Sequence, residues 1–547
     1  MTCAFYLESS LRVGPGCQFP ENELVKLYNG QTWCRFHLPM KVQGKETAKA
    51  LWDEPEIEAF NGAIFAFITE AATQGGADLS GVVFPGAISF HLTRRQLFKD
   101  TRFNGDATFL GTFNIDATFK GASFGGNATF RGNFLGATFE GARFGGNATF
   151  KGANFGDDAT FEGAGFDRDA TFEGASFQRN ATFVGASFDR AATFEGASFD
   201  RDATFERARF GRNATFKGAR FGDNATFEGA SFGGDATFEG ASFDRGATFE
   251  GASFDRDATF EGASFDRDAT FKEVSFGGNA WFRESSFSRD LLFPGASFGG
   301  DASFSAARGE GNRAAVTFST VNFTGAKFSG EIRFQNREFL DATNFHGAYF
   351  ERAPKFHGCT LHQDTFFPRQ TNFQDRSGAE AALAYRTLKH AMASVHARGE
   401  EAKFYALEQK SLLHDEDTPL SAKSFSVLYW LAADYGQSVL RPLFGILITS
   451  ASFFAIYMTF LWFCLDPTSS FVYPAIEFGD VLRFSLRQVF RPFEVLSLRG
   501  AVPAEAVHEA LLRPPLPLAL LAALHSVLTL SFLALFLLAL RRRFKLD

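Results

Sequence analysis

Cysteine is scarce in this sequence and a net positive charge is lacking, and each of these facts excludes a class of protein. The 547 residues contain 5 cysteines, an odd and dispersed set that argues against a secreted disulfide scaffold. The formal net charge is −8, so we expect no bulk attraction to nucleic acid. The N-terminal stretch MTCAFYLESSLRVG lacks a basic segment followed by an apolar run, and we therefore expect no signal peptide.

Catalytic signatures are also missing. The sequence contains no GxSxG, HExxH, Walker A or dinucleotide-binding motif. Its carboxylates recur at regular intervals along the chain, which is typical of a solvated surface. We therefore expect that the protein is not an enzyme, and that it carries no cofactor other than the structural zinc considered below.

Phenylalanine, by contrast, is abundant, with 73 residues against 9 Tyr, 5 Trp and 4 Met. The stretch GASFDRDATFEGASFDRDATF, residues 251–271, places its Phe residues at positions 254, 260, 265 and 271. Successive Phe residues are thus 6, 5 and 6 positions apart. This alternating spacing continues between Phe139 and Phe304 with few exceptions, and each Phe belongs to one unit A-[TS]-F-x-[GR]. A helix would space apolar residues by three and four, and a single strand by two. The pattern therefore predicts a solenoid of short strands and corners.

The repeat unit also predicts which side chains point inward. Ala and Phe are two residues apart and share one face of an extended segment, whereas the Thr or Ser between them points away. The intervening EG and DRD sequences suit corners, because Gly and Asp tolerate unusual backbone angles. The spacing breaks once, between Phe304 and Phe318, which predicts an inserted loop near residues 305–317.

The unit resembles the pentapeptide repeat, A-[DN]-[LF]-x-x, in a Phe-rich variant with 5/6 spacing, over residues 78–375. This resemblance implies a mainly β fold, a right-handed quadrilateral parallel β-helix with four units in each coil. A narrower two-sided solenoid with two units per turn is the structural alternative. In the four-sided form, residues separated by four units stack, and one internal ladder would consist of Phe172, Phe194, Phe216, Phe238, Phe260 and Phe282.

Composition shifts divide the chain into four predicted segments. Residues 1–77 form an N-terminal region containing Cys and His, and residues 78–375 form the β-helix. Residues 377–436 are a cytoplasmic helical linker that would cap the solenoid, and residues 437–547 are a membrane domain with two spans.

The linker is predicted to begin with a pair of helices. SGAE, residues 377–380, has the spacing of a capping box, and Gly399 fits a helix stop. A second helix is expected over about residues 400–414, with Phe404 and Leu407 facing its partner. Leu388, Met392 and Val395 would form the apolar face of the first helix.

Two uncharged segments are long enough to span a bilayer. Residues 443–464 carry no charge, and residues 518–540 contain His525 as their single titratable group. The basic sequence RRRFK, residues 541–545, follows the second segment directly and predicts a cytoplasmic C-terminus. Two spans then place both termini and the solenoid in the cytoplasm.

A basic amphipathic helix is predicted between the spans, over residues 478–499, with Arg483, Arg487 and Arg491 on one ridge. FGDVLRFSLRQVF resembles the pore helix of two-span potassium-channel-like proteins, and the order of span, short helix and span is similar. The following RPFEVLSLRG departs from the TVGYG type of selectivity filter. The helix therefore either lies in the membrane interface with snorkelling arginines, or belongs to a degenerate pore. His525 is either a functional intramembrane group or a buried hydrogen-bonded contact.

Cys3, Cys17, Cys34 and His37 are the candidate ligands of a structural zinc ion, because CRFH has the spacing of a ligand pair. The region also resembles the cysteine- and histidine-containing head of similar membrane pentapeptide proteins. Unligated core thiols are the alternative interpretation. A second group, His346, His357, Cys359 and His362, is not predicted to bind metal, because the repeat places its members on different sides of a coil.

Three functions follow from these observations. The first is a membrane-anchored cytoplasmic scaffold for protein interaction, with membrane lipid and an unknown protein as partners and the membrane domain as a site of homo-oligomerisation. The second is a channel-like or transport-related protein with the solenoid as its regulatory domain. The third is a DNA mimic that binds topoisomerases, since some soluble pentapeptide proteins act in this way.

Overall fold

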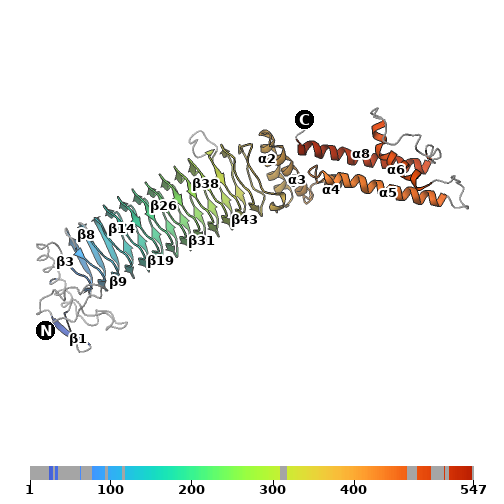
Figure 1. Cartoon of the computed structure of the whole chain (residues 1–547). Helices are drawn as coiled ribbons and strands as arrows, with labels where there is room; N and C mark the ends of the chain where they lie inside the picture. Colours follow the sequence, from blue (N-terminus) through green and yellow to red (C-terminus); the bar gives the residue numbers. More distant parts are fainter. Residues whose placement is uncertain are drawn as a thin grey trace. The chain divides into compact units, whose positions relative to one another are not determined.

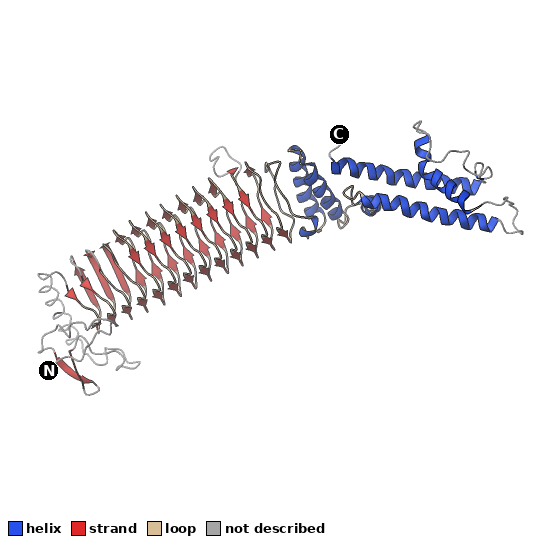
Figure 2. Ribbon diagram, in the orientation of Figure 1, coloured by secondary structure: helices blue, strands red, loops and turns tan. Residues whose placement is uncertain are grey.

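The computed structural model describes residues 24–28, 31–34, 62, 77–84, 86–92, 96–113, 117–307, 317–464, 477–494, 511 and 516–544. It divides into two compact units, Met1–Gln374 and Asp375–Asp547. The described part of the first unit is built almost entirely of short parallel strands, and that of the second is helical (Figures 1 and 2).

In the central part of the solenoid each coil contributes four strands, and each strand pairs with the strand four positions later. One coil consists of β16 (Ala170–Thr171), β17 (Ser176–Phe177), β18 (Ala181–Thr182) and β19 (Ser187–Phe188). Ala170 pairs in parallel with Ala192, four repeat units later, and the other three strands take the same step. A coil therefore has four faces, which confirms the four-sided parallel solenoid and excludes the two-sided alternative.

The inside of the solenoid is filled by Phe and Ala. Phe172, Phe183 and Phe194 are all fully buried. Phe172 and Phe194 stack in parallel, with ring centroids 4.7 Å apart. Phe183 meets Phe172 edge to face, with centroids 5.5 Å apart. The same stacking continues from ring to ring through Phe194, Phe216, Phe238, Phe260 and Phe282.

The corner that follows each Phe favours glycine in the repeat, because its backbone is left-handed. Gly174 has φ 60° and Gly185 has φ 62°, a left-handed conformation that costs residues with a Cβ about 1–2 kcal/mol. The corner is closed by the Ala175 amide, which donates to the Phe172 carbonyl oxygen at 3.0 Å. Arg207, with φ 53°, occupies the corresponding position in a later coil, so the strain is tolerated where neighbouring coils hold the corner.

The coils are less regular near both ends of the solenoid. Strands β8 (Ala107–Phe113) and β10 (Ala128–Phe134) are longer than the strands of the central coils, and Ala107 pairs with Ala128. Later in the chain, Ala302 pairs with Ile332, a longer step than the preceding one from Ala280 to Ala302, so extra residues leave the ladder there. This step supports the predicted insertion, of which residues 308–316 lie outside the described part. The last named strand is β46 (Tyr349–Phe350).

The first unit also contains a two-stranded antiparallel sheet near its N-terminus. Strands β1 (Leu24–Tyr28) and β2 (Gln31–Cys34) pair with Tyr28 opposite Gln31.

Six α-helices make up the described part of the second unit. They are α2 (Ala379–Ser394), α3 (Arg398–Leu412), α4 (Leu420–Ala433), α5 (Leu440–Cys464), α6 (Phe478–Glu494) and α8 (Leu516–Phe544).

The predicted helical pair exists, but its boundaries differ from the expected ones. Helix α2 ends before His396, which adopts φ 59°, and Gly399 lies within the first turn of α3. Gly399 is therefore not the helix stop, because His396 itself takes the left-handed conformation. The expected capping box is also wrong, because Gly378 occupies the N-cap and the Ser377 hydroxyl donates to the Asp375 carboxylate.

Helices α2 and α3 pack through most of the apolar residues expected from the sequence. Val395, expected on the apolar face of α2, is instead the C-cap of that helix and is half-buried. Leu388, Met392, Phe404 and Leu407 are fully buried. At the edge of this contact lies Glu408, 3% exposed, whose carboxylate accepts hydrogen bonds from Arg386 Nε and Lys389 Nζ, both at 2.7 Å. Two cations from α2 thus neutralise one buried carboxylate of α3, as a buried charge requires.

Candidate functional site

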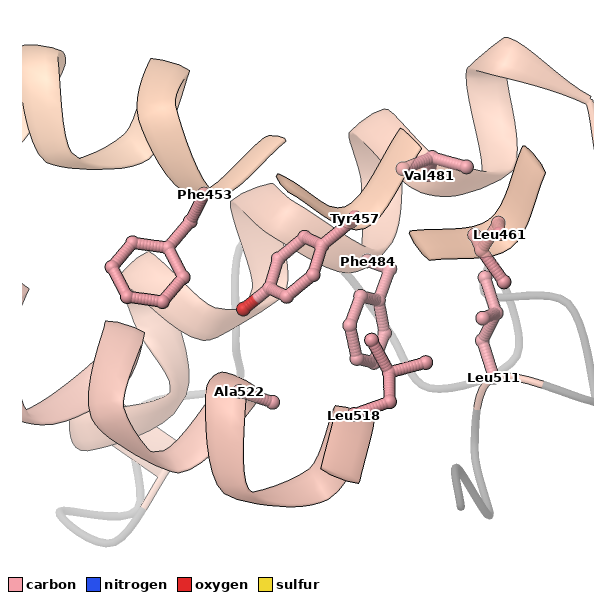
Figure 3. Packing of buried hydrophobic residues seen from close by; sticks show 8 residues of the cluster. All are labelled: Phe453, Tyr457, Leu461, Val481, Phe484, Leu511, Leu518 and Ala522. Atoms are coloured by element: carbon pink, nitrogen blue, oxygen red, sulfur yellow. The ribbon is translucent and has the colours of Figure 1, made fainter. Parts of the chain in front are cut away.

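Helices α5, α6 and α8 pack together through one apolar cluster (Figure 3). Tyr457 of α5 is fully buried and meets Phe484 of α6 edge to face, with ring centroids 5.2 Å apart. Leu518 and Ala522 contribute the surface of α8. The short helix between the two long ones is therefore packed against both of them.

The two long helices are apolar on their outer sides as well. Residues 440–462 and 516–541 are long and apolar enough to cross a membrane. Only 11% and 17% of their most apolar windows are buried within the protein, whereas the core helix of a soluble protein is mostly buried. Helices α5 and α8 contain the predicted spans 443–464 and 518–540.

His525 lies inside this helical unit, fully buried. The Tyr457 hydroxyl lies 3.2 Å from His525 Nδ1, and the Phe453 ring stacks on the imidazole with centroids 4.8 Å apart. Among the described residues, Nε2 of His525 has no hydrogen-bond partner. The structure thus places His525 in a contact between α5 and α8, whereas the sequence did not pair it with any residue.

Helix α6 has two distinct faces. Val481, Phe484, Ser485 and Gln488 are at most 4% exposed and face the long helices. The Ser526 hydroxyl of α8 donates to the Gln488 backbone carbonyl at 3.1 Å, which joins α6 to α8.

The arginine ridge lies away from this buried face. The Arg483 side chain is 58% exposed, and its guanidinium lies 3.7 Å from the Asp480 carboxylate. Arg487 is half-buried. Arg491 belongs to α6, but its side chain is outside the described part, as are residues 495–499 of the predicted helix.

The predicted zinc ligands cannot be brought together here. Cys34 ends β2, while Cys3, Cys17 and His37 lie outside the described residues. Within the described ranges, no group of three or more His, Cys, Asp or Glu side chains is arranged to hold a metal ion.

The described part of the solenoid has regular outer faces. Outward Thr residues follow one another from coil to coil, as Thr171 pairs with Thr193. Charged side chains form ion pairs between neighbouring coils, such as Lys151 with Glu173 at 2.8 Å and Lys217 with Glu239 at 3.0 Å.

Sequence reasoning missed a polar ladder that runs along one corner of the solenoid. The Asn279 amide donates to Asp257 Oδ1 at 2.8 Å, and the Asp301 amide donates to Asn279 Oδ1 at 2.9 Å. The Asp or Asn before an Ala thus accepts a backbone amide of the next coil. The recurring DAT and NAT triplets were the available signal for this ladder.

A buried arginine was missed as well. Arg337 is 1% exposed, and its guanidinium donates to the carbonyl oxygens of Phe304, Ser285 (3.0 Å) and Phe282 (3.4 Å). Nothing in the repeat pattern singles out this residue, because it lies beyond the irregular coil and meets residues up to 55 positions away.

Comparison with known proteins agrees with this architecture. Residues 133–176, 172–220, 216–264 and 260–308 match the family model described as pentapeptide repeats (9 copies). The chain matches no curated protein and no solved structure. Residues 133–308 are therefore pentapeptide repeats wound into a β-solenoid, a scaffold fold for protein interaction.

Proposed function

We propose that the protein is a membrane-anchored cytoplasmic scaffold. Helices α5 and α8 would cross the bilayer, and the solenoid would present its faces to a protein partner. The observation that carries this proposal is the exposure of large apolar side chains along both helices, including Leu447 (58%), Ile448 (65%) and Leu537 (53%). In water such surfaces would aggregate, whereas in lipid they meet an apolar solvent.

The orientation follows from the charges that flank the second span. Arg541 and the basic residues after it favour a cytoplasmic C-terminus, so that two spans return the chain to the side on which it began. Both termini and the solenoid would then be cytoplasmic. Homo-oligomers would form through the membrane unit.

Thiol labelling tests this orientation. Glu416 is exposed in the segment between α3 and α4, so Glu416→Cys in a chain without its native cysteines provides one accessible thiol. We expect a membrane-impermeant maleimide to label intact cells poorly and lysed cells well. Labelling of intact cells as strong as that of lysed cells would place this segment outside the cell and overturn the orientation.

A channel-like or transport role is the second candidate. It is favoured by the buried polar side chains Ser485, Gln488 and His525, which lie between the three helices at positions where an anchor needs only apolar contacts. Ion flux through liposomes separates the two roles. No flux from the full chain supports the anchor, whereas chloride-selective flux that is lost on changing Arg483, Arg487 and Arg491 to Gln supports the channel.

A further inference from the structure

An open apolar groove lies among helices α4, α5 and α8. Its volume is about 550 Å³, and its walls include Leu428 and Leu431 of α4, Phe444 and Ile448 of α5, and Phe532 of α8. Of the residues that line it in the described part of the chain, Arg441 alone is charged.

Gly445 holds two walls of this groove close together. A Cβ at this position would lie 2.5 Å from the Phe532 ring, so a larger residue would push α8 away from α5. Gly445 lies near the beginning of α5, and Phe532 lies in the second half of α8. If the two helices span a bilayer, the groove lies toward the cytoplasmic leaflet.

Helix α4, which forms one wall, is itself apolar and exposed. Leu420 is 82% exposed, Phe425 73% and Leu428 61%. Lys423 is the single charged residue of this helix. A helix with a single charge and this much exposed apolar surface is poorly suited to water, but it is suited to the boundary between headgroups and acyl chains.

Arg441 brings positive charge to the groove. The Arg441 guanidinium donates to the Trp430 carbonyl oxygen at 2.9 Å and lies 3.9 Å from Asp434 Oδ1. Lys410 Nζ lies 3.3 Å from the same carboxylate oxygen. Two cations thus share this carboxylate, and the Arg441 side chain, 43% exposed, is the more distant of the two. The guanidinium is therefore open to an anion at the mouth of an apolar groove.

We propose that this groove binds one acyl chain of an anionic glycerophospholipid, whose phosphate lies at Arg441. The inference rests on the proposed membrane insertion of α5 and α8. It is supported by the continuity of the groove with the exposed sides of both helices, by its apolar walls and by the complementary charge at its end. A neutral peptide or a second copy of α4 would offer no anion to Arg441.

The test uses the full chain, reconstituted in vesicles of equimolar phosphatidylglycerol and phosphatidylcholine. After a strong alkaline wash to confirm insertion, the protein is extracted in mild detergent, and native mass spectrometry counts the lipids that remain bound. We expect retention of phosphatidylglycerol in preference to phosphatidylcholine. Ile448→Trp fills the groove and should abolish this preference, whereas Ile456→Trp, on the same helix and 42% exposed but outside the groove, should preserve it.

Charge variants test the phosphate contact separately. Arg441→Gln should lower phosphatidylglycerol retention about fivefold, the value of one basic contact near an anionic surface. Arg441→Lys should largely restore it. Equal retention of both lipids, no effect of Ile448→Trp, or dimers that bury the groove would each overturn the proposal. A chain released by the alkaline wash would instead overturn the proposed membrane anchoring, so the two failures are distinguishable.

Discussion

Phe172 and Phe194 occupy the same position in consecutive coils, and their rings stack with planes only 2° apart. Each coil therefore serves as the template for the next, and the core is one continuous series of such contacts. The stability of the solenoid depends on keeping every Phe on its own face.

Whole-coil deletion tests this dependence. Removal of residues 183–204 brings Phe205 onto Phe161, because both belong to the ladder that contains Phe183. We expect the thermal midpoint of the full chain in detergent to change by about 4 °C or less. Removal of residues 183–187 deletes one face and should lower the midpoint far more. Equal losses from the two deletions would show that the coil assignment is wrong.

Substitutions within one coil should differ in cost according to the face that they change. Ala258 is fully buried, so Ala258→Leu should overpack the core and lower the free energy of unfolding by about 1–3 kcal/mol. Asp257→Ala removes the acceptor of the Asn279 amide and should cost about 1 kcal/mol. Asp255 is exposed, and Asp255→Ala should stay within about 0.5 kcal/mol of the parent. Urea unfolding midpoints rank the three variants by loss of stability. If Asp255→Ala lost the most stability, the assignment of inward and outward positions would be wrong.

We expect Arg337 to be required for the stability of the solenoid next to the longer step from Ala302 to Ile332. Burial lowers the pKa of its guanidinium to about 10, so it remains charged at neutral pH. Arg337→Met leaves three carbonyl oxygens without this donor and should reduce the free energy of unfolding by about 3 kcal/mol. Arg333→Met, at a residue that is 29% exposed, is the control and should cost about 1 kcal/mol or less. If the urea midpoint of Arg337→Met equals or exceeds that of the parent, the hydrogen bonds from Arg337 to these carbonyl oxygens do not stabilise the fold.

The Cys359 thiol should be unreactive in the folded protein. Burial raises its pKa from 9.0 to about 12. The folded state then keeps a proton that the unfolded state loses, so stability should fall as the pH rises above about 9. In a chain with the other cysteines replaced by Ser, iodoacetamide should alkylate Cys359 slowly at about pH 8 and much faster in urea. Comparable rates in the two states would show that the folded chain does not shield this thiol.

Most of the solenoid could be predicted because the sequence pattern that determines each strand is local and is repeated along the chain. The spacing of Ala and Phe alone assigns the inward face. The length of a coil did not follow from the repetition, which also allowed two units per turn; the resemblance to pentapeptide repeats implied four units, and the strand pairing decides for four. The Phe172 ladder follows from the inward face together with the four-unit coil that the resemblance implies.

The polar contacts could not be predicted in the same way. Arg337 reaches carbonyls in earlier coils, and Glu408 is paired with cations from another helix, so neither has a local signature. The partner of His525 depends on how α5 packs against α8, and no periodicity in either span contains that information. Hydropathy indicated the two long helices, but the exposed apolar surface of α4 was not recognised.

The most direct test of the central proposal is the behaviour of the full chain in membranes under a strong alkaline wash. The parent should remain in the membrane pellet and float with vesicles, because its exposed apolar helices lie in lipid. Leu447→Lys combined with Leu530→Lys places charge on surfaces that are 58% and 47% exposed. The membrane account predicts that this variant is extracted or degraded, because a lysine at the centre of a span costs about 2.5–3.5 kcal/mol. A parent chain that is released by the wash, together with a variant that is more soluble and equally folded, would contradict membrane anchoring.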